Sequence, residues 1–122
     1  MSHVIDASAL LAYVTGEDGA AVVETALAHT AHCSAANWSE VSQKILASGR
    51  DWQLVKALLL STDLRIEPVQ MIDAEWAARR WRRGDGLSLA DRLCLALADR
   101  LALPVLTADS AWGSTEMIRQ IR

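Results

Sequence analysis

Residues 3–11 read HVIDASALL, a short apolar run that ends in an acid and passes directly into a helical pattern. The run His3-Val4-Ile5-Asp6 has the composition of a buried strand, and Ser8 is placed to cap a helix that Gly16 ends. The same succession of strand and helix recurs along the chain. Strands separated by helices predict a parallel sheet with right-handed crossovers, which is an α/β fold.

The remaining elements follow from apolar periodicity and from the residues that interrupt it. Further strands are predicted at residues 31–34, 64–69, 104–107 and 116–122, and further helices at 18–28, 37–48, 51–60, 73–83 and 88–101. Pro68 limits strand pairing, so the strand at 64–69 is expected at an edge or to end there, and 116–122 is expected as a terminal edge strand. We expect one domain, residues 1–122, with a mostly parallel central sheet of about four to five strands flanked by helices.

The composition sets limits on the class of protein. The chain is 52% apolar and 22% charged, as is ordinary for a globular domain. No apolar run approaches the roughly 18 residues that span a bilayer, and no signal peptide is recognisable. We therefore expect a cytoplasmic protein without membrane contact. Cys94 lies on the apolar face of a predicted helix, which favours a buried free thiol, and the three His residues form no metal-binding motif.

Four acids stand where strands end or helices begin: Asp6, Glu40, Asp91 and Asp109. None has a Lys or Arg at a spacing that would obviously neutralise it. The carboxyl ends of parallel strands lie side by side, so the four acids are expected on one rim of the sheet. Such a group is costly unless a cation is bound. Carboxylates without Cys or His favour Mg²⁺ or Mn²⁺, and a site of this kind binds phosphate oxygens and activates water.

Each acid also has a purely structural explanation. Asp6 can cap the helix that follows it, and Asp109 can form a turn. The other two acids each stand three residues after a capping residue, Asn37 and Ser88, as in a capping box. Since helix N-termini favour ionised carboxylates, capping and metal binding are compatible. The alternative function is a non-catalytic α/β binding module whose acids serve only as helix caps.

Four segments carry the acids, and together they span most of the chain: Val4–Leu11 (VIDASALL), Ala36–Val41 (ANWSEV), Gly86–Ala98 (GLSLADRLCLALA) and Val105–Trp112 (VLTADSAW). In this order the segments resemble the PIN-domain ribonucleases, specifically the VapC toxins of bacterial type II toxin–antitoxin modules. The resemblance implies an endoribonuclease that uses Mg²⁺ or Mn²⁺ to activate water and leaves a 3′-hydroxyl and a 5′-phosphate. It also implies a homodimer and a cognate, VapB-like antitoxin protein that covers the acidic site.

The resemblance assigns roles to individual residues. It implies that Asp6, Asp91 and Glu40 hold the metal, directly or through water, and that Asp109 completes the site or orients a water. Two hydroxyl residues near these acids, Ser8 and Thr107, are expected either to support a carboxylate or a water, or to serve only as a helix cap and a strand-end hydroxyl.

The net charge of −3 does not exclude an RNA substrate. Of the 15 acids four belong to the candidate site, which leaves 11 against 12 Lys and Arg. A basic cluster precedes the turn Gly84-Asp85-Gly86, and one further Arg adjoins Asp91. The candidates for contacts with RNA phosphates are Arg79, Arg80, Arg82, Arg83 and Arg92. A solvated helix face is the other interpretation of these arginines.

Overall fold

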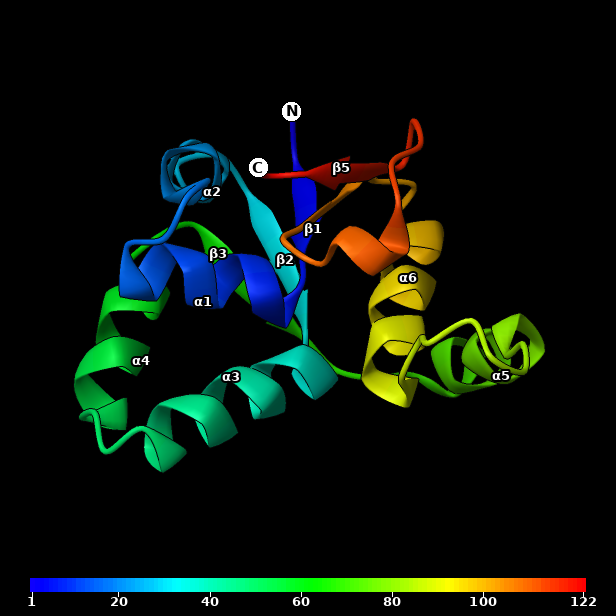
Figure 1. Cartoon of the computed structure of the whole chain (residues 1–122), viewed down its shortest axis with the longest axis horizontal. Coiled ribbons are helices and arrows are strands. Elements are labelled where there is room, and N and C mark those ends of the chain that lie inside the picture. Colours follow the sequence, from blue (N-terminus) through cyan, green and yellow to red (C-terminus); the bar gives the residue numbers. More distant parts are fainter.

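The computed structural model describes residues 1–122, and its five strands form one sheet in the order β3-β2-β1-β4-β5 (Figure 1). The strands are β1 (His3–Ile5), β2 (Ala31–Ser34), β3 (Leu64–Glu67), β4 (Val105–Thr107) and β5 (Ile118–Gln120). Every neighbouring pair is parallel. The predicted α/β class is confirmed, and so is the prediction that the third and last strands lie at the edges.

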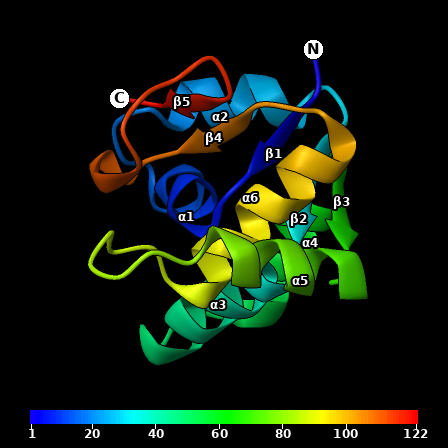
Figure 2. The same cartoon turned by 90° about the vertical axis from the view of Figure 1, so that its right-hand side faces the viewer.

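Six helices surround the sheet: α1 (Ala7–Thr15), α2 (Ala20–Leu27), α3 (Ala35–Ala47), α4 (Trp52–Leu60), α5 (Met71–Arg80) and α6 (Leu89–Leu101), with a 3₁₀ helix η1 (Ser110–Trp112). α1 and α2 cover one face of the sheet, and α6 covers the other with α5 outside it (Figures 1 and 2). α3 contacts both α1 and α6 beyond the carboxyl ends of the strands. None of these helices is both long and apolar enough to cross a membrane.

β1 and β4 are buried on both faces of the sheet, which explains their continuous apolar sequences. Val4 and Val105 pack against α6, whereas Ile5 and Leu106 pack in the larger core beneath α1 and α2. Cys94 lies in the smaller core and is a buried free thiol, as predicted.

Two helix starts differ from the prediction because residues at the strand ends themselves act as caps. Asp6 caps α1 by accepting a hydrogen bond from the Ala9 amide, so the interpretation of Asp6 as a cap is confirmed and the prediction of Ser8 as the cap is wrong. Ser34, the last residue of β2, caps α3 through the Ala36 amide. The helix therefore begins two residues earlier than predicted, and the capping box at Asn37 is wrong. No linking loop separates either strand from its helix.

The boundaries of α2 and α5 are also displaced from the predicted ones. α2 begins only after Gly19, whose φ of 90° is incompatible with a right-handed helix, rather than at residue 18. α5 occupies residues 71–80 instead of 73–83, because Trp81 adopts an extended conformation with ψ of 133°. The predicted capping box at the start of α6 is confirmed, with Ser88 and Asp91 bonded in both directions.

Gly19 is the point where the connection between α1 and α2 meets the end of the chain. A Cβ atom there would lie 2.7 Å from the Ile121 carbonyl oxygen and from its side chain. Gly49 has a similar φ of 77°, but a Cβ atom on it would meet nothing within 4 Å. The two glycines therefore separate the effect of backbone conformation from the effect of space.

We predict that Gly19→Ala destabilises the protein more than Gly49→Ala does. The left-handed backbone costs either alanine about 1–2 kcal/mol. Overpacking against Ile121 adds about 1–3 kcal/mol for Gly19→Ala alone. Urea unfolding of both variants measures the difference, and equal losses of stability would show that the contact at Ile121 relaxes freely.

Candidate active site

The structure brings the four acids around one pocket of about 150 Å³ at the carboxyl ends of the central strands. Asp6 follows β1 and Asp109 follows β4, while Glu40 and Asp91 come from α3 and α6. β1 lies between β2 and β4: the chain adds β2 and β3 on one side of β1 and then β4 and β5 on the other, so the strand order reverses here. Such a topological switch point is where open α/β sheets bind ligands.

Asp6 is the most buried of the acids, with 4% of its surface exposed. Its carboxylate accepts hydrogen bonds from the Ser8 hydroxyl at 2.8 Å, the Ala9 amide at 2.9 Å and the Thr107 hydroxyl at 2.5 Å. Burial raises the pKa of Asp6 to about 6, although the three hydrogen bonds oppose the rise. The nearby charge of Asp91 raises this pKa further. The ionised form of Asp6 is therefore held at a cost that a bound cation would offset.

The two hydroxyl residues tie Asp6 to the segment that carries Asp109. The Ser8 hydroxyl accepts a hydrogen bond from the Ala108 amide at 2.9 Å, and the Thr107 hydroxyl accepts one from the Asp109 amide at 3.0 Å. The two hydroxyl oxygens lie 3.2 Å apart. The prediction that these hydroxyls contact a carboxylate is confirmed for Asp6.

Asp91 and Asp109 each serve as a cap and also line the pocket. One oxygen of Asp91 accepts from the Ser88 amide at 2.9 Å, and one oxygen of Asp109 accepts from the Ala111 amide at 2.9 Å. The second oxygen of each carboxylate has no protein hydrogen bond in the structure. Capping thus fixes these side chains while leaving one oxygen of each for a ligand.

Glu40 is positioned by Asn37, which sequence reasoning regarded only as a cap. The buried Asn37 amide group donates to the Glu40 carboxylate at 2.9 Å and to the Ala90 carbonyl at 3.3 Å. It therefore links α3 to the first turn of α6 beside Asp91. The spacing of three residues between Asn37 and Glu40 was visible in the sequence, but the contact with Ala90 depends on the tertiary fold.

Lys44 also lines the pocket, and sequence reasoning missed it. It lies four residues after Glu40 on α3, a spacing that places the two side chains on one helix face. The prediction that no acid has an obviously neutralising basic residue overlooked this spacing at Glu40. No ion pair forms between the two in the structure, because their charged atoms are more than 4.0 Å apart. Lys44 continues into a second groove of about 320 Å³ that contains Arg50.

The residues that line the pocket fit a divalent cation that keeps some of its water ligands better than one that side chains coordinate completely. No three Asp, Glu, His or Cys side chains converge closely enough to hold one metal ion. The donors around the pocket are nevertheless carboxylates, with no His or Cys among them. Mg²⁺ prefers oxygen ligands and retains several waters, so it can bind through one or two carboxylates. The oxygen donors of this pocket therefore suit Mg²⁺ or Mn²⁺ that is bound partly through water.

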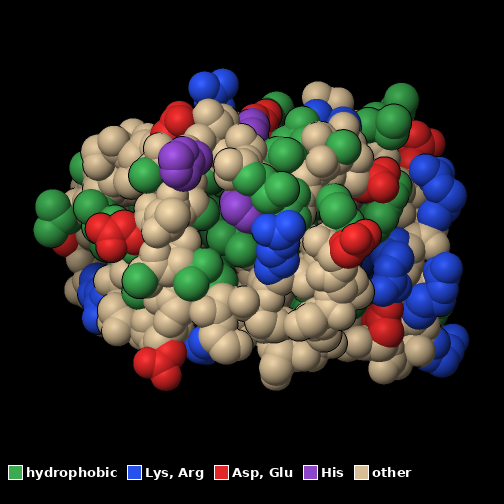
Figure 3. All heavy atoms as spheres, turned by 90° about the horizontal axis from the view of Figure 1, so that it is seen from above, with side chains coloured by type: hydrophobic (Ala, Val, Ile, Leu, Met, Phe, Trp, Pro, Cys, Tyr) green, Lys and Arg blue, Asp and Glu red, His purple; other side chains and the backbone are tan.

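The candidate RNA-binding arginines lie away from this pocket. Figure 3 shows basic side chains gathered at the end of the molecule that carries α5. Arg79, Arg82 and Arg83 are exposed there, whereas Arg80 pairs with Asp85 at 3.0 Å. Arg92 donates to the Ala77 carbonyl at 2.8 Å and so joins α6 to α5. Arg82 donates to the Arg79 and Trp81 carbonyls at 2.8 Å, and Arg83 lies 5.8 Å from the centroid of the Trp81 ring. None of the three exposed arginines is paired with an acid.

The comparisons with known proteins agree with this architecture. Residues 3–116 match the family model of the PIN domain. A toxin–antitoxin complex from Klebsiella pneumoniae aligns with a TM-score of 0.82 at 20% identity, covering 99% of this chain and 98% of that one. The comparison with curated proteins found no match.

Two further solved structures have the same fold. The sarcin–ricin loop cleaving toxin VapC20 from Mycobacterium tuberculosis aligns with a TM-score of 0.72 at 20% identity, covering 94% of this chain and 98% of that one. VapBC2 from Rickettsia felis, bound to a promoter DNA fragment, gives a TM-score of 0.76 at 16% identity and 98% coverage of both chains. The family model spans nearly all the strands and helices that build the acidic pocket, and the chain belongs to the PIN domain family.

Proposed function

We propose that this chain is a Mg²⁺- or Mn²⁺-dependent endoribonuclease, the VapC-type toxin of a toxin–antitoxin pair. The observation that carries the proposal is the single pocket lined by Asp6, Glu40, Asp91 and Asp109 without any His or Cys. PIN-domain membership and a structural neighbour that is a ribonuclease toxin support it. In this proposal all of residues 1–122 form one domain, and the protein acts in the cytoplasm.

The four acids have different parts in the proposed site. Asp6 and Asp91 bind the cation, with Glu40 held beside them by Asn37 and Asp109 completing the pocket. A divalent cation, when bound, offsets the charge on a phosphate and lowers the pKa of water. Ser8 and Thr107 fix the orientation of the Asp6 carboxylate through their hydrogen bonds.

Basic side chains account for the RNA substrate in the proposal. Lys44 stands at the pocket, where it meets a phosphate adjacent to the cleaved bond. Arg79, Arg82 and Arg83 contact phosphates farther along the RNA. A homodimer and a VapB-like antitoxin complete the proposed assembly, in line with the toxin–antitoxin complexes among the structural neighbours.

The alternative is a binding module in which the acids serve only as caps. It is favoured by one observation, since Asp6 and Asp109 cap α1 and η1, and Asp91 completes the capping box of α6. Caps alone give no reason for a divalent cation to stabilise the fold. The response to metal therefore separates the two functions.

We predict that Asp6→Asn and Asp91→Asn each lower Mg²⁺- or Mn²⁺-dependent RNA cleavage about 100-fold or more, since each removes charge that stabilises the bound cation. The measurement is cleavage of total RNA by the purified chain, with a chelator as the metal-free reference. Asp99→Asn is the matched control, because Asp99 is an exposed acid on the same helix as Asp91. Unchanged cleavage in both site variants, with folding retained, contradicts the proposed function.

We predict that Mg²⁺ or Mn²⁺ stabilises the wild-type protein but not Asp6→Asn. At a metal concentration about ten times the Kd, the free energy of unfolding rises by about 1.4 kcal/mol. Chemical unfolding with and without metal measures this gain, and Asp99→Asn is expected to match the wild type. A wild-type protein whose stability is the same in metal and in chelator supports the cap-only alternative.

We predict that replacing Arg79, Arg82 and Arg83 together by Gln weakens RNA binding while leaving the stabilisation by metal intact. Each lost phosphate contact lowers the slope of log K against log salt by about 0.7 for single-stranded RNA, so the combined loss is about 2. Binding of the Asp6→Asn form to labelled RNA at several salt concentrations gives the slope without cleavage. Arg65→Gln, on the exposed edge strand β3, is the control, and an unchanged slope identifies the three arginines as a solvated face only.

A further inference from the structure

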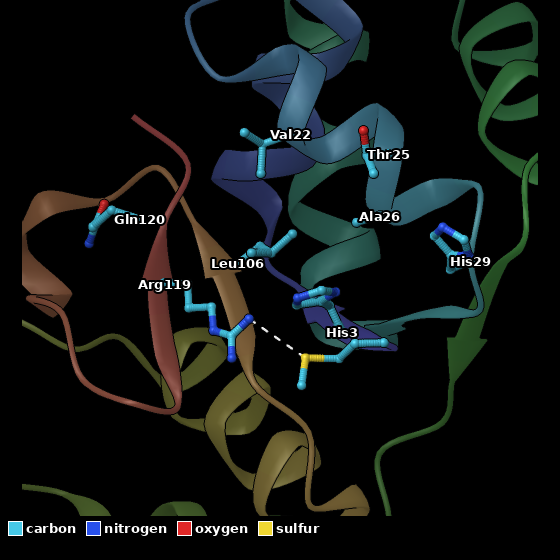
Figure 4. Close-up of a pocket in the computed structure, with 9 residues that line it drawn as sticks. His3, Val22, Thr25, Ala26, His29, Leu106, Arg119 and Gln120 are labelled. Atoms are coloured by element: carbon cyan, nitrogen blue, oxygen red, sulfur yellow. Dashed lines mark hydrogen bonds between the residues drawn. The ribbon is translucent and has the colours of Figure 1, made fainter.

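A pocket of about 520 Å³ lies away from the acids, between α2 and the strands β1, β4 and β5 (Figure 4). His3 and Leu106 line its floor, and Arg119 lies across it from α2. Figure 3 views the same side of the molecule, where His and basic side chains lie among apolar ones. Its volume is within the range of pockets that hold small organic ligands.

The pocket arises from the register of the edge strand. Leu106 pairs with Arg119, so the face of the sheet that is apolar on β4 becomes basic on β5. α2 covers Ile5 and Leu106 but turns Val22 and Thr25 toward the opening, and His29 follows just after the end of this helix. Val22 and Thr25 lie three positions apart, which places them along one side of the helix. Part of the sheet next to Arg119 is therefore not covered by a helix.

The polar groups of this pocket lack acidic partners. No Asp or Glu lines it, and Arg119 forms no ion pair. The guanidinium contacts only the Met1 sulfur, at 3.6 Å, which is a weak acceptor (Figure 4). The Nδ1 atom of His3 is buried and has no hydrogen-bond partner. Buried polar groups without partners are uncommon in folded proteins, and this imidazole lies near the unpaired Arg119.

We propose that this pocket binds a small organic anion, a phosphate monoester or a carboxylate with an apolar body, through Arg119 and His3. The planar guanidinium fork matches the two oxygens of either head group. Val22, Ala26 and Leu106 supply an apolar wall for the rest of the ligand. His29 also lines the pocket.

A bound anion would change the electrostatic surroundings of His3. Burial, and then the positive charge of Arg119, lower the pKa of His3. A bound anion would act in the opposite direction, because it favours the protonated imidazole. The site does not depend on the nuclease proposal, since none of its residues lines the acidic pocket.

The test is isothermal titration of the full chain, in chelator at pH 7, with phenyl phosphate, benzoate, inorganic phosphate and phenol. Chelator keeps divalent metal from recruiting the anions to the acidic pocket. We expect saturable one-to-one binding of phenyl phosphate or benzoate, and the tighter of the two identifies the head group. Phenol lacks the charge and inorganic phosphate lacks the apolar body, so both should bind about tenfold or more weakly.

The variant Arg119→Gln is expected to weaken the binding about tenfold or more, whereas Arg65→Gln on the other edge strand leaves it unchanged. Both side chains are exposed, so folding should be retained, and thermal unfolding checks this. Arg119→Lys retains the charge but not the fork, and an intermediate affinity supports two-oxygen recognition. The proposal is overturned if neither anion binds at up to about 10 mM, which is weaker than the affinity expected of a formed site. Equal binding by Arg119→Gln also overturns it.

Discussion

The buried carboxylate of Asp6 joins the parts of this molecule that the candidate site requires. Its two oxygens accept hydrogen bonds from the start of α1 and from the end of β4, so one side chain fixes the relative position of both. The same burial raises its pKa to about 6. Above about pH 6 this raised pKa costs the fold its full penalty in stability, and the penalty decreases as the pH falls and disappears only below the ordinary carboxyl pKa of 3.8. The packing of α1 against β4 and the charge of the acidic pocket therefore both depend on the Asp6 carboxylate.

β4 connects the two pockets of the molecule. Leu106 faces α2 and the basic pocket, while the next residue, Thr107, donates to Asp6. Gln120 on the neighbouring strand donates to the Asp109 carbonyl at 2.8 Å and thereby braces the loop that carries this acid. Charges of opposite sign also lie in different parts of the molecule, with carboxylates at the carboxyl ends of the strands and exposed arginines at α5. An RNA bound across both would meet charges of opposite sign along its length.

Most of the fold followed from the sequence because two strong signals agree. The apolar runs of β1 and β4 are buried on both faces, and Gly16 and Ser88 mark helix ends with ordinary capping chemistry. The start of α3 was misjudged because Ser34 acts both as a strand end and as a cap; Asp6 does the same at α1, where its capping role was one of two interpretations. A pattern that assigns each residue to one element does not represent this double use.

The candidate site was only partly predictable for a related reason. The four acids were visible as residues at strand ends and in first helical turns, and parallel pairing brings such positions to one rim. The bridge from Asn37 to Ala90 joins residues 53 positions apart, and no local spacing encodes it. Lys44 was within reach, since it follows Glu40 by one helical turn. The basic pocket was not, because it depends on which residue of β5 pairs with Leu106.

The position of β1 in the middle of the sheet has a consequence for how the protein is made. Asp6 is synthesised before its partner Thr107, which follows 101 residues later. Contacts this distant in sequence form late, after a large loop has closed. A nascent chain therefore carries an incomplete acidic pocket until β4 has left the ribosome and paired with β1. For the proposed nuclease, this order of assembly delays activity until β4 has been made and has paired with β1.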